Sequence, residues 1–526
     1  MTLTNEPLEG PGQPIDAALS TVTADRTNAG NGRRAPSAIL GSGQLFTSTR
    51  PLLVLEHFRT PYAVTGEDEC DGLCTLRART DGPALLWPSS QAAGGALLAA
   101  ELHHERRPPI PLFARVVGDA RAQAALAQYG GHWTRFAAIV QPDGDPLGSL
   151  WRREDGSVFL PFDPDEAQLA FLSERYHGAL AGSLKQDCRR TAVRGYYRAR
   201  GLVPRPVWIW MRRRYARIQA RATFPRWPIE PALHDFLDLL HSILESIAGE
   251  PMPSIGPWPH GKRWALVLTH DVETQRGLAA LDPVLALERS LGVRSCWNFA
   301  PRRYKVTLSQ IESLLTSGCE VGVHGLYHDG RDLDPDTLPE RLPGMREAAD
   351  AWRATGFRSP ATRRDWAAMP LLGFDYDSSY PDTDPFEPQA GGCCAWLPFF
   401  NRSTVELPIT MPQDHTLFVI LRQRDEQTWV DKAQFLRSRG GMALLDTHPD
   451  YLTDPVIFGS YRRFLERFAP DPEAWLALPR EVNTWWRRRA ESSLVRTADG
   501  WTISGPACGE ATVEFRSCDP EYPEVV

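Results

Sequence analysis

The sequence predicts an α/β protein, a distorted or incomplete (β/α) barrel preceded by a mixed α/β N-terminal domain. Two observations favour this fold class. Residues 263–490 alternate short apolar runs with segments of helical period, which is typical of parallel strands joined by right-handed crossovers. The chain has 526 residues, more than one ordinary domain, and the part before residue 250 mixes strand and helix patterns.

Composition narrows the class of protein. Hydrophobic residues make up 42% and charged residues 23%, as in ordinary globular proteins, and the formal net charge is -7. With this charge balance we expect no overall positive potential that would attract nucleic acid or an anionic membrane. We find no secretory signal at the start and no run near the ~18 apolar residues that span a bilayer. The nine cysteines are scattered and odd in number, so we expect a cytoplasmic protein without a disulfide framework; oligomeric state is not indicated.

The N-terminal half divides by composition. Residues 1–44 are rich in Gly, Pro, Asn, Ser and Thr, and we expect a disordered leader. Residues 45–250 are predicted to form the N-terminal α/β domain. Within it, Leu52–Leu55 and Ala84–Trp87 resemble short buried strands, and Ala96–His103 resembles a helix.

An arginine-rich helical segment ends this half. Residues Cys188 to Arg226 include the run Met211-Arg212-Arg213-Arg214-Tyr215. One interpretation is a contact with nucleic acid or phosphate. The alternative, which we favour, is a solvated helix face or a clamp against the acidic remainder. A proline-rich linker is predicted at 251–262.

The region 263–490 is the predicted catalytic domain. Strands are expected at Trp264–Leu268, Ser295–Phe299, Cys319–Val323, Thr404–Ile409, Leu417–Leu421 and Met442–Leu445, with helices between most of them, the last at Pro472–Arg489. Residues 491–526 contain two β-type runs and read as a small β appendage. Because chemistry in α/β folds is placed where strands end, the residues that follow these runs are the candidates for a functional site.

Three groups of polar residues stand at such strand ends. Asp271 and Glu273 follow the first run; residues i and i+2 of an extended chain share a face, so both carboxylates can point into one cleft. His324 and His328 follow another run, and His448 follows a third. A set of two histidines and a carboxylate is typical of a hydrolytic metal site.

Each group alone has a plainer interpretation. Paired acids before Gly277 also suit a helix N-terminus, and histidines four apart are usually surface or core residues. Their joint occurrence in one α/β region favours the metal site.

Four motifs in order resemble the polysaccharide deacetylase family, the NodB-homology carbohydrate esterases, over about 263–490. That family carries an acidic motif, an H-x-x-x-H motif, an R-x-P motif and a late L-x-H motif. The corresponding segments here are Thr269-His270-Asp271-Val272-Glu273, His324 to His328, Gly356-Phe357-Arg358-Ser359-Pro360 and Asp446-Thr447-His448. The resemblance implies a barrel of the polysaccharide deacetylase type.

The resemblance also implies roles for six residues. Asp271 matches the catalytic base, Arg358 the cation that keeps it ionised, and His448 the general acid. Glu273, His324 and His328 match the ligands of one divalent ion, zinc by expectation, with cobalt, nickel or manganese as alternatives. Glu273 stands where the family usually has aspartate. For the carboxylate that orients His448, the candidates Asp375, Asp377 and Asp446 remain open, and Trp297, Trp366 and Trp396 are candidates for a sugar-stacking wall.

The implied function is removal of acetyl groups from N-acetylated, less readily O-acetylated, sugars of a polysaccharide or its precursor. The alternatives are a metal-dependent amidohydrolase acting on a small non-sugar amide, and a non-catalytic carbohydrate-binding protein. The implied partner is a carbohydrate substrate, without nucleic acid or a transmembrane segment.

Overall fold

The central strand of the C-terminal region is β11 (Trp264–Val272), whose nine residues are all buried. A strand that is apolar along its length is stable only where both faces of its sheet are covered. The computed structural model describes residues 44–66, 72–105, 107–181, 195 and 204–515.

The C-terminal sheet is built mainly from parallel strands. Its order is β16-β17-β15-β14-β13-β12-β11-β18, and β19 also pairs with the first half of β11. Every pairing along it is parallel except β16 with β17. The strands are β12 (Ser295–Phe299), β13 (Glu320–Val323), β14 (Gly356–Phe357), β15 (Tyr376–Asp377), β16 (Phe399–Asn401), β17 (Thr404–Glu406), β18 (Met442–Thr447) and β19 (Ala474–Ala477). This topology agrees with the predicted strand–helix alternation.

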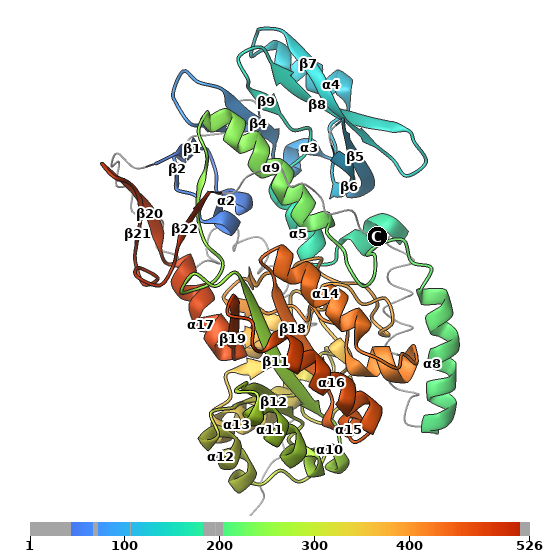
Figure 1. Ribbon diagram of the computed structural model, residues 1–526. Coiled ribbons are helices and arrows are strands. Elements are labelled where there is room, and N and C mark those ends of the chain that lie inside the picture. The colour runs from blue at the N-terminus through green and yellow to red at the C-terminus, as the bar shows by residue number, and fades with distance from the viewer. Residues whose placement is uncertain (1–43, 67–71, 106, 182–194, 196–203, 516–526) are drawn as a thin grey trace, which may run out of the picture. The chain divides into compact units, whose positions relative to one another are not determined.

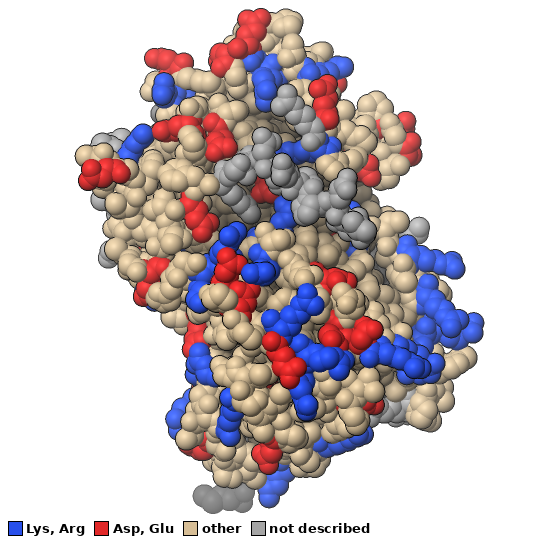
Figure 2. Space-filling view, viewed as in Figure 1, with Lys and Arg blue, Asp and Glu red and all other residues tan. Residues whose placement is uncertain are grey.

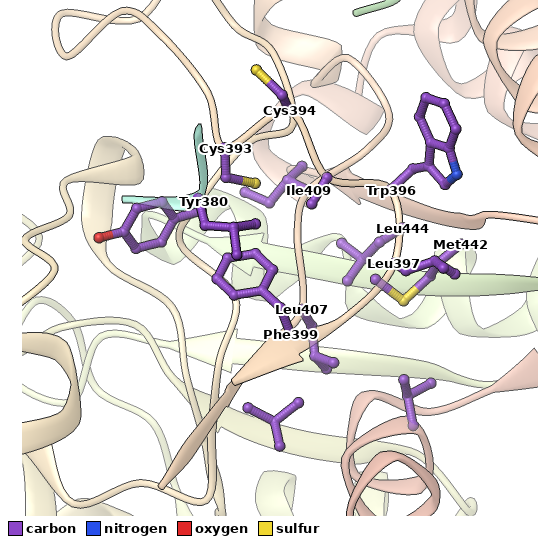
Figure 3. Close-up of a cluster of buried hydrophobic side chains, with 14 of the residues drawn as sticks. Tyr380, Cys393, Cys394, Trp396, Leu397, Phe399, Leu407, Ile409, Met442 and Leu444 are labelled. Atoms are coloured by element: carbon purple, nitrogen blue, oxygen red, sulfur yellow. The ribbon is translucent and has the colours of Figure 1, made fainter. Parts of the chain in front are cut away.

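The two ends of this sheet approach one another through irregular chain. The amide of Ile409 donates to the carbonyl of Tyr380, and the amide of Met411 donates to the carbonyl of Leu444 in β18. Side chains from this segment, from residues 393–399 and from β18 pack together there, as Figure 3 shows. The barrel is therefore distorted and incomplete, as predicted, because no regular strand pairing closes it among the described residues.

Helices connect the parallel strands (Figure 1). Those between β11 and β14 are α10 (Gln275–Ala279), α11 (Leu281–Ser290), α12 (Leu308–Thr316) and α13 (Leu338–Trp352). Those around β18 and β19 are α14 (Gln427–Ser438), α15 (Pro449–Leu452), α16 (Pro455–Phe468) and α17 (Pro479–Ala490). α16 begins at Asp454, whose side chain accepts from the amide of Val456, and buries its apolar stripe of Ile457, Tyr461 and Phe464.

The N-terminal region contains a second sheet of order β2-β1-β3-β4-β9-β8-β7-β5-β6. Its strands are β1 (Phe46–Ser48), β2 (Tyr62–Val64), β3 (Leu73–Arg77), β4 (Ala84–Pro88), β5 (Leu98–His104), β6 (Arg107–Ala114), β7 (Trp133–Val140), β8 (Pro146–Arg153) and β9 (Val158–Phe159). Its helices are α2 (Leu53–Phe58), α3 (Ser90–Ala93), α4 (Asp119–Ala127), α5 (Pro164–Leu172) and α6 (Tyr176–Ala181), followed by α8 (Arg205–Gln219) and α9 (Ala232–Ala248). Residues Gly41–Val526 form one compact unit, so the predicted boundaries inside it stay a prediction.

The last residues described form two small β elements. β20 (Ser493–Thr497) pairs with β21 (Gly500–Ser504), and β22 (Val513–Phe515) pairs with β10 (Pro253–Ile255). β10 lies inside the predicted linker. The predicted leader falls almost wholly outside the described residues. No helix among the described residues is long and apolar enough to span a bilayer.

Three element predictions are wrong. Leu52–Leu55 begins helix α2, because an apolar run of four residues has no period that separates helix from strand. Ala96–His103 is mostly strand β5, whose pairing with β6 and β7 overrides the helix propensity of its alanines and leucines. Leu417–Leu421 lies largely in a π-helix, η4 (His415–Ile420).

The last predicted helix of the catalytic domain is only partly correct. Residues Pro472–Arg489 contain both strand β19 and helix α17. Pro479 stands at the start of the true helix, where its missing N–H costs nothing.

Candidate active site

The predicted site residues stand at the carboxyl ends of neighbouring parallel strands. Asp271 is the second-last residue of strand β11, His324 follows β13, Arg358 follows β14 and His448 follows β18. Parallel strands end at one edge of their sheet, so side chains distant in sequence meet there. A pocket at this edge is lined by Asp271, Glu273, His324, His328 and His448. The other lining residues are Trp208 and Arg212 of α8, His415 of η4, and Ala361, Thr362, Glu387, Pro388, Gln413 and Tyr451.

Asp271 is a buried carboxylate with two donors. The Asn298 amide donates to its Oδ1 at 2.8 Å, and the Arg358 guanidinium lies 3.5 Å from its Oδ2. Burial alone would raise the pKa of Asp271, but the neighbouring His324, Arg358 and His448 outweigh it and hold that pKa below its usual value. The side chain is therefore an ionised proton acceptor at neutral pH.

Arg358 connects Asp271 to other buried polar groups. Its guanidinium lies 3.0 Å from Asp446 Oδ1 and donates to the hydroxyls of Thr269 and Ser378 at 3.2 and 2.9 Å. The side chain is 1% exposed, so its positive charge acts at short range without water between. Burial and the charge of Asp271 raise the pKa of Asp446 to about 8.

His324 is oriented by the backbone beside it. Its Nδ1 lies 3.0 Å from the carbonyl oxygen of Arg358, which can only accept, so Nδ1 carries the proton and Nε2 presents a lone pair. Nε2 is buried and has no hydrogen-bond partner among the described residues. Burial lowers the pKa of His324 to about 4, which keeps the ring neutral.

His328 reaches His324 through a turn rather than a helix. Gly325 has φ 63°, and a Cβ there would lie 2.2 Å from the Asp332 carboxylate, so only glycine fits. His328 itself has φ 55°, and its ring centroid lies 4.9 Å from that of His324. Its Nε2 is also buried and without hydrogen-bond geometry to any described residue, although it lies 3.2 Å from Glu273 Oε1.

Glu273 lies between the two histidine groups. Its Oε1 is 3.2 Å from His328 Nε2 and 3.9 Å from His448 Nε2. Burial opposes ionisation, but His328 and His448 hold the pKa of Glu273 well below its usual value. The backbone amide of Glu273 donates to Asp450 at 3.0 Å, which fixes the chain where β11 ends.

Asp414 is the carboxylate that contacts His448. Its Oδ1 lies 2.6 Å from His448 Nδ1, and its Oδ2 accepts from the His448 amide at 2.8 Å. Although burial lowers the pKa of His448, Asp414 outweighs it and raises that pKa well above the usual value. Sequence reasoning missed Asp414. Of the three predicted candidates, Asp446 pairs with Arg358 and Asp377 accepts a hydrogen bond from Ser379. None of the three, Asp375 included, forms a hydrogen bond with His448 among the bonds described.

Two imidazole nitrogens in the pocket could bind a divalent ion. Nε2 of His324 presents a lone pair because its Nδ1–H bonds to a carbonyl, the usual second contact of a histidine ligand, and Nε2 of His328 lies beside the Glu273 carboxylate without hydrogen-bond geometry to it. Among the described residues, a tighter group is Asp271, Asp446 and His448, whose ligand atoms lie within 4.8 Å of one another. We favour Glu273, His324 and His328, because Arg358 sits against both aspartates of the tighter group and its charge opposes a cation there.

Aromatic residues line one side of the pocket, but they are not the tryptophans predicted from sequence. Trp297 and Trp396 are buried in the core, where they pack on His270 and His234. Trp208 of α8 stacks on His415 at 6.2 Å between ring centroids, and His415 stacks on Tyr451 at 5.5 Å. All three line the pocket. A half-buried tryptophan 60 residues upstream of the first motif gave no signal in sequence.

Comparison with known proteins finds similar folds over less than half of the chain. A protein described as a polysaccharide deacetylase from Mycobacterium smegmatis is 21% identical, covering 45% of this chain and 95% of that one, with a TM-score of 0.36. One so described from Pseudomonas aeruginosa is 17% identical, covering 46% and 97%, with a TM-score of 0.37. Puue allantoinase is 16% identical, covering 44% and 92%, with a TM-score of 0.36.

No protein-family model matches the chain, and no curated protein matches it. Polysaccharide deacetylases, the family that the four motifs resemble, are thus among the solved structures that are similar to it.

Proposed function

We propose that the protein is a metal-dependent hydrolase that removes acetyl groups from N-acetylated sugars, in a polysaccharide or its precursor. The observation that carries the proposal is a pair of buried imidazole nitrogens without hydrogen-bond geometry to any described residue, set with a base and an acid around one pocket. Glu273, His324 and His328 would hold the ion. Such an ion, when bound, lowers the pKa of a water and polarises an acyl carbonyl.

Asp271 acts as the base in this scheme. It is ionised, and Asn298 occupies its Oδ1, so Oδ2 is the oxygen that takes the proton of the attacking water. Arg358 holds the carboxylate in place and keeps its charge. Asp446 on the other side of Arg358 fixes the guanidinium, and its raised pKa limits the negative charge that gathers there.

His448 acts as the acid. Asp414 keeps the ring protonated and holds Nδ1, which leaves Nε2–H free to protonate the departing amine. Asp271 and His448 both line the pocket, so a substrate bound there can meet a proton acceptor and a proton donor in one orientation.

The pocket walls suit a sugar. Trp208 and Tyr451 provide aromatic faces, on which the apolar face of a pyranose ring can pack, and Arg212, Glu387 and Gln413 provide polar groups for hydroxyls. These lining groups support a carbohydrate over a small non-sugar amide.

The first experiment measures metal content of the purified protein after exchange against zinc. Wild type is expected to hold one ion per chain, and His324→Ala to lose it because a ligand is gone. His132→Ala, at a histidine that is 70% exposed, is the matched control. Asp446→Asn tests the competing group. If it loses the ion while His324→Ala retains it, the ligand assignment is wrong.

The second experiment measures acetate release from N-acetylglucosamine oligomers and from O-acetylated xylan. Asp271→Asn is expected to keep its metal and lose about 10²–10⁴-fold in kcat, the usual contribution of a general base. Ordinary turnover by that variant would remove the base role. Absence of acetate release by wild type from both substrates would remove the sugar deacetylase proposal.

A further inference from the structure

Helix α8 carries an unusual outward face. Five of the twelve large hydrophobic side chains that are exposed among the described residues lie on this one helix, with between 48% and 62% of their surface accessible: Val207, Trp210, Met211, Tyr215 and Ile218. The opposite face is buried, through Arg212, Ala216 and Gln219. An ordinary surface helix turns its apolar residues to the core and carries polar residues on the face toward water.

The buried face fixes the helix to the catalytic region. The Arg212 guanidinium donates to the carbonyl of Phe386 at 2.6 Å, and the Gln219 amide donates to the carbonyl of Glu387 at 3.1 Å. Arg213 donates to the carbonyl of Val419 in η4 at 2.9 Å. The orientation of α8 is therefore determined by specific contacts, and its apolar outer row is not available to the core.

Exposed arginines lie beside the apolar row, along α8 and just after it. Residues 188–229 contain twelve arginines and no Asp or Glu, in a chain whose net charge is -7. Arg214, Arg217 and Arg221 are exposed, and none has an ion pair with a described carboxylate. Arg214 lies over the Trp210 ring, 5.6 Å from its centroid. Figure 2 shows Lys and Arg gathered at the right-hand edge, where α8 lies in Figure 1.

We propose that the outer face of α8 docks the protein on an anionic phospholipid surface. Exposed tryptophan, tyrosine and aliphatic side chains flanked by arginine are the composition of helices that lie in the membrane interface. The arginines supply attraction to lipid phosphates and the apolar row supplies insertion. A protein partner with an acidic groove, or a second copy of this chain, is the competing occupant.

Docking in this orientation has a consequence for the pocket. Trp208 and Arg212 of the same helix line it, so a bilayer bound to the outer face would lie across α8 from the pocket. This consequence depends on the proposed function, whereas vesicle binding does not. Binding is measured without substrate, so its failure leaves the acetate-release experiment unaffected.

The test is co-flotation of the full chain with vesicles. One set contains phosphatidylcholine and phosphatidylglycerol in equal amounts, and the other phosphatidylcholine alone. The apolar variant is Trp210→Ser with Met211→Ser and Ile218→Ser, and the charge variant is Arg214→Gln with Arg217→Gln and Arg221→Gln. All six side chains are exposed, so both variants are expected to fold, which circular dichroism checks.

A matched control removes the same charge elsewhere. Arg303→Gln, Arg462→Gln and Arg467→Gln are also exposed, and Arg462 lies over Phe458 at 5.4 Å as Arg214 lies over Trp210. At roughly fivefold per arginine, the charge variant is expected to lose on the order of 100-fold in binding to the anionic vesicles. The control should keep wild-type binding, and the apolar variant should lose about tenfold or more.

Three results would overturn the proposal. Wild type fails to float with the anionic vesicles, or binds both vesicle types equally. The control variant loses binding as much as the α8 charge variant, which shows only a net-charge effect. Sedimentation velocity finds a dimer that the apolar variant abolishes while vesicle binding is absent, which identifies the second copy as the occupant.

Discussion

Replacing Asp414 by asparagine removes a charge while preserving shape. The carboxylate accepts three hydrogen bonds: Oδ1 from His448 Nδ1 and from the His415 amide at 2.7 Å, and Oδ2 from the His448 amide at 2.8 Å. An asparagine has one acceptor oxygen. In either orientation of the side chain, its NH₂ group faces at least one donor. The less costly orientation places the NH₂ group against the His448 amide alone.

The expected magnitudes follow from that geometry. One buried amide left without an acceptor costs about 1–3 kcal/mol of unfolding free energy. Losing the negative charge lowers the pKa of His448, so less of it is protonated at neutral pH. We expect acetate release to fall by about 10²–10⁴-fold, the usual range for a general acid.

The assay compares kcat/KM of wild type and Asp414→Asn at pH 6 and pH 8. Because an acid catalyst works only when protonated, the deficit of the variant should grow as pH rises. Asp163→Asn is the control, since Asp163 is similarly buried, accepts several hydrogen bonds and does not line the pocket. The double variant with His448→Gln should be no slower than His448→Gln alone. A deficit that does not change with pH, or additive losses, would refute the reasoning.

Two further predictions concern buried carboxylates outside the pocket. Arg364 donates to both oxygens of Glu174 at 3.0 and 2.5 Å, so Glu174→Gln should cost about 3–5 kcal/mol in urea unfolding. Glu320 has its pKa raised to about 7 by burial, against an ordinary 4.5. Between these two pKa values the folded state keeps a proton on Glu320 that the unfolded state has released. The free energy of unfolding is therefore expected to fall by about 3 kcal/mol as the pH rises from 4.5 through 7. Glu320→Gln should remove that dependence. Glu312→Gln, at an exposed ion pair with Arg353, is the control for both variants. It should change the free energy of unfolding by under about 1 kcal/mol, and an effect as large as that of Glu174→Gln or Glu320→Gln would contradict the corresponding prediction.

Short-range pattern predicted the strands that carry the site. The runs ending near Leu268, Phe299, Val323 and Leu445 are strands β11, β12, β13 and β18, because fully buried parallel strands are apolar along their length and bounded by loops. Polar residues directly after such runs then mark one edge of the sheet. Local sequence is sufficient for that inference.

Partners that come from irregular chain escaped prediction. Asp414 follows Pro412 in a segment with neither helix nor strand period, and it meets His448 only because the amide of Met411 bonds to β18. The polar run Gln413-Asp414-His415, which begins four residues after the end of the predicted strand Thr404–Ile409, was the available signal. Trp208 is similar, since its place in the pocket depends on how α8 packs on η4, which no local pattern encodes.

The N-terminal region contributes to the site by holding the segment that forms one pocket wall. The Tyr176 hydroxyl accepts from the amide of Gly392 and donates to its carbonyl, at 2.9 and 2.8 Å. Arg364 is held by Glu174, and the loop carrying Glu387 is held by Arg212. Loops of 20 or more residues without regular structure are seldom ordered unless other elements fix their backbone groups. Residues 361–392 contain little regular structure beyond the two-residue strand β15, so the upstream residues that bond this segment contribute to the shape of the pocket, although none of them lies in the four motifs.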